Sequence, residues 1–157
     1  MPIIEQGKRA PGFKAQDQDG TTHELGQYKG KHVVLFFYPK DDTAGCVKEA
    51  CSFRDHAAQL KKAGAVVLGV SRDGAASHQR FITKYGLNFP LLVDEGAISQ
   101  AYGTWVEKHN YGRTYMGIQR ATFLIGPDGR VVKVWPKVKP EDHAVEVLEA
   151  IAATKAA

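Results

Sequence analysis

The stretch HVVLFFYPKDDTAGCVKEACSFRD, residues 32–55, carries the features on which the expected fold depends. Residues 32–38 form an unbroken apolar run of strand length, which is typical of a central strand buried on both faces. After a short polar loop the pattern becomes helical from residue 44, and Gly64 is a suitable stop. A buried strand followed by a helix is the start of a βαβ unit.

The rest of the chain continues this alternation of strands and helices. Asp19-Gly20 and Pro127-Asp128-Gly129 are turn signals, each lying between two short apolar segments. The expected strands are residues 13–16, 21–24, 32–38, 65–71, 90–94, 121–126 and 130–135. The expected helices are residues 44–63, 75–85, 98–102 and 141–154. Together they predict an α/β fold with parallel and antiparallel strands mixed, in a single domain over residues 1–157.

Composition excludes several classes of protein. Hydrophobic residues make up 43% of the 157 residues and charged residues 24%, which fits a soluble globular protein. We find neither a signal-peptide pattern nor the roughly 18–20 apolar residues that span a bilayer, so we expect a cytoplasmic protein without membrane contact. The net charge of +4 is spread among acids, and no basic stripe predicts nucleic-acid binding.

The chain has two cysteines, Cys46 and Cys51, both on the helix expected from residue 44. Thr43 could be the N-cap, which would place Cys46 at about the third helical position. Unpaired backbone N–H groups and the helix dipole stabilise an anion in this first turn. We therefore expect a larger fraction of Cys46 to be the reactive thiolate at neutral pH than of an ordinary cysteine.

The spacing of the two cysteines is too long for a bond on an intact helix. Five residues give a rise of about 7.5 Å and a Cα–Cα distance of roughly 8.6 Å. A disulfide is infeasible beyond about 7 Å unless the backbone moves. The pair suits a cycle in which Cys46 reacts first and local unfolding then brings Cys51 to it. Two other interpretations are a pair of small buried hydrophobes and a zinc site, although there is no second cysteine pair.

The segment FFYPKDDTAGCVKEACSFRD (36–55) resembles the active-site segment of the peroxiredoxins, in particular the bacterioferritin comigratory protein or peroxiredoxin Q subfamily. APGF (10–13) and YMGIQRATFLIGPDG (115–129) are also similar to segments of that family. The resemblance covers nearly the whole chain. It implies a thioredoxin-like fold, with a central mixed β-sheet flanked by helices and an N-terminal β-hairpin.

The resemblance also implies an activity, namely thiol-dependent reduction of hydrogen peroxide and organic hydroperoxides. It makes Cys46 the peroxidatic cysteine, which becomes a sulfenic acid, and Cys51 the resolving cysteine of an intramolecular disulfide. It maps the family's arginine onto Arg120. Thioredoxin, or else glutaredoxin, would be the reductant. No metal or other cofactor is expected, and the subfamily is often monomeric.

The residues themselves are suited to these roles. Arg120 could hold the thiolate and donate to peroxide oxygens with its fixed fork. The Thr43 hydroxyl could donate to either species, and Pro39 could fix the loop and shield the site. Glu49 either orients Arg120 or is an ordinary surface acid. The family's usual TPGCT is TAGCV here, so Ala44 replaces a proline, and we expect this change to loosen the loop and make local unfolding easier.

Two rival functions remain open from the sequence. A thioredoxin-like disulfide oxidoreductase is disfavoured by the five-residue spacing and by the lack of a proline in residues 117–123. A redox-sensing or holdase protein would also need a reactive thiol, so the sequence does not separate it from an enzyme.

Overall fold

The computed structural model describes residues 2–156, so the expected domain of residues 1–157 extends one residue beyond the described range at each end. A five-stranded sheet forms its centre, with the order β5-β4-β3-β8-β9. Strands β3, β4 and β5 are parallel, while β8 and β9 run antiparallel to their neighbours. The strands are β3 (His32–Phe37), β4 (Ala65–Ser71), β5 (Leu91–Val93), β8 (Ala121–Ile125) and β9 (Val131–Trp135).

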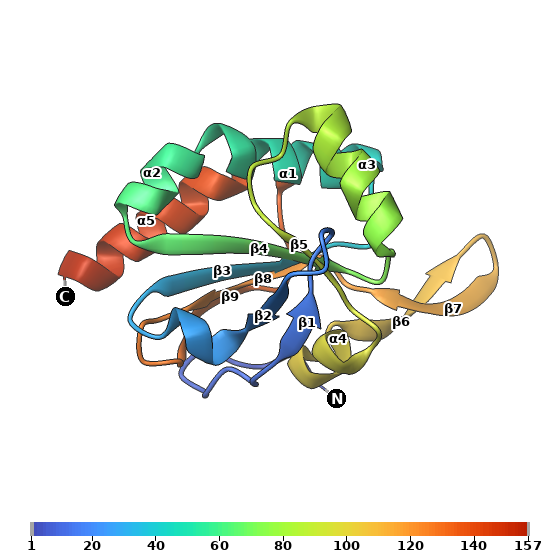
Figure 1. The fold of residues 1–157 in the computed structure, drawn as a ribbon. Coiled ribbons are helices and arrows are strands. Elements are labelled where there is room, and N and C mark those ends of the chain that lie inside the picture. The colour runs from blue at the N-terminus through green and yellow to red at the C-terminus, as the bar shows by residue number, and fades with distance from the viewer. Residues whose placement is uncertain (1, 157) are drawn as a thin grey trace.

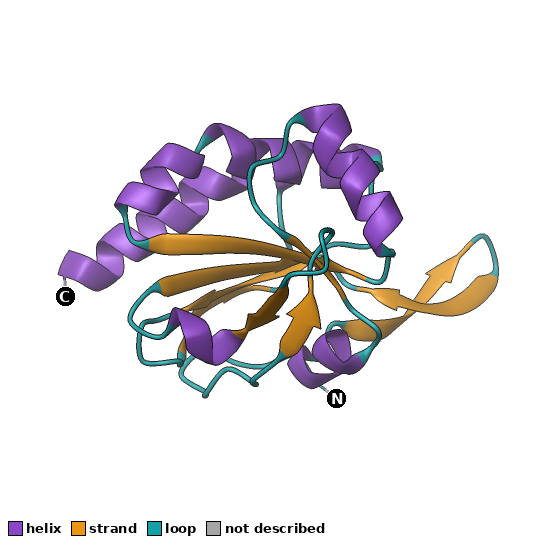
Figure 2. Ribbon diagram, viewed as in Figure 1, coloured by secondary structure: helices purple, strands orange, loops and turns teal. Residues whose placement is uncertain are grey.

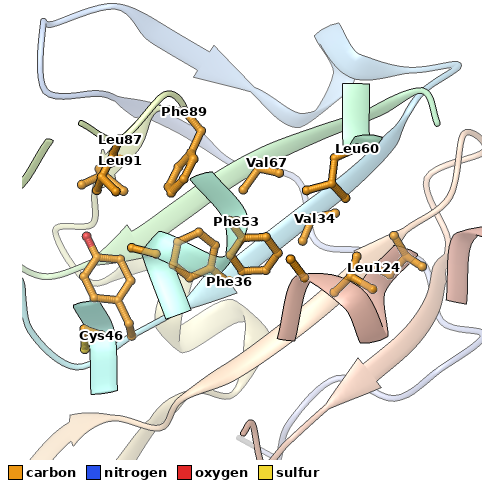
Figure 3. Packing of buried hydrophobic residues seen from close by; sticks show 14 of the residues in the cluster. Val34, Phe36, Cys46, Phe53, Leu60, Val67, Leu87, Phe89, Leu91 and Leu124 are labelled. Carbon is orange, nitrogen blue, oxygen red and sulfur yellow. The ribbon is translucent and has the colours of Figure 1, made fainter. Parts of the chain in front are cut away.

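Strand β3 is the middle strand, and all six of its residues are buried. Its side chains alternate between two apolar clusters. Val34 and Phe36 belong to one cluster, while Leu35 and Phe37 belong to the other. Figure 3 shows the first cluster, in which Phe36 stacks on Phe53 at a centroid distance of 4.8 Å. The unbroken apolar run is therefore explained by burial on both faces of the sheet.

The two faces of the sheet are covered differently (Figures 1 and 2). Four helices lie over one face, and another helix, a 3-10 turn and the N-terminal hairpin lie over the other. The first group is α1 (Ala44–Asp55), α2 (Ala57–Lys62), α3 (Ala75–Tyr85) and α5 (His143–Ala156). The second group is β1 (Lys14–Gln16), β2 (Thr22–Glu24), η1 (Leu25–Tyr28) and α4 (Ala97–Tyr102).

The expected architecture is confirmed: a mixed sheet flanked by helices, with an N-terminal hairpin. Strand β4 and helix α3 have the predicted bounds, and Gly86 ends α3 in the left-handed conformation that favours glycine. Across the described residues, no helix is both long enough and apolar enough to cross a membrane.

The prediction of one continuous helix over residues 44–63 is wrong. The helix breaks at His56, whose backbone has φ −108° and ψ 13°. The His56 ring nitrogen Nδ1 lies 2.9 Å from the carbonyl oxygen of Ser52, so the side chain competes for a backbone acceptor of the helix. The last helix also starts later than expected, at His143, after the 3-10 turn η2 (Pro140–Asp142).

A second hairpin, which the sequence did not lead us to expect, is formed by β6 (Trp105–Asn110) and β7 (Arg113–Ile118). Tyr111 and Gly112 connect the strands, and both have positive φ, 51° and 73°. Two successive residues with positive φ form a type I′ turn, whose twist matches that of the flanking strands. The usual sequence of this turn is Asn-Gly rather than Tyr-Gly. The hairpin projects from the body of the molecule (Figure 1).

Candidate active site

The loop that joins β3 to α1 is fixed from the core side by buried hydrogen bonds. Asp41 is 7% exposed, and its carboxylate accepts three of them. The donors are the hydroxyl of Tyr38 at 2.6 Å, the hydroxyl of Ser77 at 2.8 Å and Nδ1 of the buried His78 at 2.7 Å. A buried charge that is fully hydrogen-bonded holds its surroundings rigidly. The start of α1 is therefore placed by the strand and by α3 together.

Thr43 is the N-cap of α1, as the sequence predicts, but its hydroxyl makes no capping bond. Its carbonyl accepts the N–H of Val47 at 2.8 Å, and its hydroxyl donates to the carbonyl of Lys40 at 2.9 Å. The hydroxyl thus closes the loop on itself. Pro39 begins this loop and is exposed at the surface.

Cys46 is the third residue of α1 and is only 1% exposed. Its sulfur lies 3.2 Å from Nη2 of Arg120, which donates to it. Figure 3 shows Cys46 at the edge of the apolar cluster that contains Phe36 and Phe53. The sulfur therefore lies in the first helical turn, where it is shielded from water and contacted by a guanidinium.

Sheet pairing brings Arg120 to this helix although the two cysteines lie about 70 residues earlier in the chain. Strands β3 and β8 are antiparallel, and Phe37 at the end of β3 pairs with Ala121 at the start of β8. Arg120 directly precedes Ala121, so it lies beside the loop that follows β3. Sequence reasoning missed the part played by Gly45: a Cβ there would lie 3.0 Å from Nη2 of Arg120. A glycine inside a helix, which is otherwise unfavourable, was the available signal.

Glu49 is fully buried, and its Oε1 lies 2.8 Å from Nη1 of Arg120. The guanidinium therefore uses one Nη on the carboxylate and the other on the sulfur of Cys46. Burial raises the pKa of Glu49 to about 7, although the charge and hydrogen bond of Arg120 act in the opposite direction. Burial lowers the pKa of Arg120, but the charges of Glu49 and Cys46 outweigh it and raise that pKa overall. Of the two interpretations of Glu49, the geometry favours the one in which it orients Arg120.

Cys51 is half-buried, lies on the same unbroken helix α1, and carries a free thiol, as does Cys46. Ideal helix geometry puts the two Cα atoms roughly 8.6 Å apart. The structure thus joins Cys46, Arg120 and Glu49 in one contact network. It leaves Cys51 on the helix beyond bonding reach and Pro39 at the surface.

The chain matches known proteins over nearly its whole length. Residues 6–134 match the model of the AhpC/TSA family. A protein named putative peroxiredoxin bcp from Coxiella burnetii is 50% identical over 146 residues, which is 92% of this chain and 97% of that protein. Peroxiredoxin Bcp of Bacillus subtilis is 46% identical over 149 residues, which is 94% of this chain and 95% of the relative.

Solved structures agree with these matches. A peroxiredoxin Q of Xylella fastidiosa has a TM-score of 0.92 at 37% identity and covers 99% of both chains. A peroxiredoxin Q of Xanthomonas campestris has a TM-score of 0.85 at 42% identity and covers 90% of both chains. This chain therefore belongs to the AhpC/TSA family and, within it, to the Bcp and peroxiredoxin Q group of peroxiredoxins.

Proposed function

We propose that Cys46 is the peroxidatic cysteine of a thiol peroxidase that reduces hydrogen peroxide and organic hydroperoxides, and that Cys51 resolves its oxidised sulfur. The chain, as a peroxiredoxin, takes hydroperoxides as substrates and a thiol as reductant. The observation that carries the assignment of Cys46 is the 3.2 Å contact between its sulfur and Nη2 of Arg120 in the first turn of α1.

The first step is attack by the Cys46 thiolate on the terminal oxygen of a hydroperoxide. The S–O bond forms as the O–O bond breaks, giving a sulfenic acid and an alkoxide or hydroxide, which takes a proton to leave as alcohol or water. Negative charge moves from sulfur to the departing oxygen. Arg120 is placed to stabilise both, because its guanidinium has five N–H donors and Glu49 holds it in position.

The second step joins the two cysteines. The Cys51 thiol condenses with the Cys46 sulfenic acid, so a disulfide forms and water leaves. Because the distance on an intact helix is too great, the start of α1 must unwind first. An external dithiol then reduces the disulfide by exchange. We propose thioredoxin as that dithiol, with glutaredoxin as the alternative, acting on a monomer in a reducing compartment such as the cytoplasm.

The remaining site residues are proposed to act through the loop. Pro39 restricts its backbone, and the Thr43 hydroxyl closes it onto Lys40 at 2.9 Å. Together with the hydrogen bonds to Asp41, these contacts set the direction in which α1 begins. Organic hydroperoxides are included among the substrates because the solved Xanthomonas campestris bacterioferritin comigratory protein is described for its alkyl peroxide reduction activity.

Stopped-flow reduction of hydrogen peroxide by the wild type, Cys46→Ser and Cys51→Ser tests this function. Cys46→Ser should abolish the fast step. Cys51→Ser should keep one stoichiometric turnover and lose recycling through the internal disulfide. Equal rates in all three proteins would contradict the proposal. Rapid insulin reduction without peroxide consumption would instead favour a disulfide oxidoreductase, and full biological activity of Cys46→Ser would favour a binding role.

A further inference from the structure

A second cation, Lys108, lies on the hairpin next to the candidate site. Lys108 is on β6, and the partner strand β7 leads directly into the segment that carries Arg120. Trp105 at the base of β6 pairs with Ile118, and the chain reaches Arg120 two residues later. The neighbours of Lys108 in the strand, Glu107 and His109, are exposed, whereas Lys108 itself is half-buried. Residues outside β6 therefore cover part of the Lys108 side chain.

The stem of Lys108 leans toward the base of the hairpin. A Cβ on Gly117 would lie 3.2 Å from Cδ and 3.4 Å from Cε of Lys108. Gly117 pairs with Val106, which is two residues closer to the base than Lys108 is. The missing side chain at Gly117 leaves the space through which the lysine stem passes. The stem of Lys108 is consequently directed toward the base of the hairpin, where the chain continues to Arg120, rather than toward its tip.

The charge of Lys108 interacts with the charges of Arg120 and Cys46. Burial is the main cause that lowers the pKa of Lys108, the positive charge of Arg120 lowers it further, and the negative charge of Cys46 acts in the opposite direction. Within residues 2–156, no acidic side chain forms an ion pair with Lys108. Arg120, by contrast, is paired with Glu49. Lys108 thus adds a positive charge that is not paired with a carboxylate in the described part of the chain.

We propose that Lys108 is a specificity-determining residue, whose ammonium group selects hydroperoxides that carry a carboxylate close to the O–O bond. This proposal rests on the proposed function, since it concerns the substrate of the same Cys46. A cation that is partly removed from water attracts a nearby anion more strongly than an exposed lysine does. It also raises the local concentration of anionic ligands at the entrance to a site.

The test compares two substrates that differ only in charge, a short alkyl hydroperoxide bearing a carboxylate and its methyl ester. The readout is the ratio of kcat/KM for the acid over that for the ester, at low ionic strength. Lys108→Met should lower this ratio by about five- to tenfold, the size expected for one charge pair at intermediate dielectric. Lys108→Arg should restore most of it, because the charge returns. Added salt should bring the wild-type ratio toward that of Lys108→Met.

A matched control is Lys62→Met, which changes the net charge equally but lies at the end of α2 and is exposed. The ratio of kcat/KM for the acid over that for the ester should be the same in Lys62→Met as in the wild type. An unchanged ratio in Lys108→Met, or an equal fall in Lys62→Met, would overturn the proposal while leaving the peroxidase function intact. If the wild type reduces neither hydroperoxide, the proposed function fails, and this inference fails with it.

Discussion

Arg120 is the residue on which the chemistry of the site depends most, after Cys46 itself. Its two terminal nitrogens divide between the Cys46 sulfur and the buried carboxylate of Glu49. A fork of this kind is pre-organised, because the carboxylate fixes the plane of the guanidinium before any substrate arrives. The sulfur and the donors that stabilise its products are therefore held in one rigid unit.

Replacing Arg120 should slow peroxide reduction strongly. Arg120→Met should lower the second-order rate constant by about 10²–10³-fold, the usual cost of losing one pre-organised donor to developing charge. Arg120→Lys should recover only part of the loss, because lysine has charge but no planar fork. Stopped-flow fluorescence with hydrogen peroxide measures both. Arg113→Met, at the exposed tip of the hairpin, is the control and should react at the wild-type rate. A rate above one tenth of the wild type in Arg120→Met would count against this role.

Glu49 should make stability depend on pH near neutrality. Burial raises its pKa to about 7 in the folded protein, against 4.5 as the ordinary value. The folded state therefore binds the proton more tightly than the unfolded state does. Its stabilising contribution is complete below pH 4.5 and is lost as pH rises through about 7, an effect of up to about 3 kcal/mol. Glu49→Gln cannot titrate, so this part of the pH dependence should disappear from its urea unfolding curves. Parallel pH profiles of the wild type and Glu49→Gln would contradict the raised pKa.

At the scale of elements, the 3-10 turn η2 and the start of α5 are held against α1. Lys48 pairs with Glu141 at 3.0 Å, and the Ser52 hydroxyl accepts the backbone N–H of Ala144 at 3.1 Å. The first contact is exposed and the second is buried. Because α1 must unwind before the two cysteines can join, these contacts oppose the second step of the proposed cycle.

Breaking the buried contact should destabilise the protein and speed disulfide formation. Ser52→Ala leaves the N–H of Ala144 without its partner, at a cost of about 1–3 kcal/mol. Lys48→Met removes an exposed ion pair and should cost under about 1 kcal/mol. Urea unfolding measures the loss of stability in each variant. Trapping the free thiols at intervals after one equivalent of peroxide measures the rate of disulfide formation. Slower disulfide formation in Ser52→Ala than in the wild type would show that α5 does not restrain α1.

Elements that local pattern determines were predictable, whereas those that depend on long-range contacts were not. Strand β4 and helix α3 have apolar patterns and a terminal glycine, so their bounds follow from the sequence. The hairpin β6–β7 was missed because Tyr111 adopts a positive φ that tyrosine rarely does. The same limit applies to the site. The motif indicates Cys46 and Arg120, but the hydrogen bonds to Asp41 and the approach of Lys108 arise only from tertiary contacts.

At the scale of the whole molecule, the sheet separates two apolar clusters that share its central strand. Because β3 contributes side chains to both clusters, neither can be lost without disturbing the other. This arrangement supports our proposal that the chain is one domain. It also places the site where one cluster meets the surface, at the end of β3.

Unfolding should consequently be a single cooperative transition. Trp135 belongs to the cluster beneath α1 and α5, while Trp105 packs against the other cluster. Variants Trp105→Phe and Trp135→Phe each leave one tryptophan, so fluorescence reports the two faces separately. Both should unfold at the urea midpoint given by far-UV circular dichroism of the same variant. Separate midpoints within one variant would divide the chain into two units.

The most direct test of the mechanism is hydrogen exchange over α1 before and after oxidation, read by mass spectrometry. Before peroxide is added, residues 47–55 should be protected as an intact helix, since the Val47 N–H is the one that bonds to the N-cap carbonyl of Thr43. After one equivalent of hydrogen peroxide, the wild type should contain the Cys46–Cys51 disulfide and exchange rapidly at the start of α1. Cys51→Ser should form the sulfenic acid and keep the helix protected. A wild-type protein that contains the disulfide while α1 stays fully protected would contradict the account.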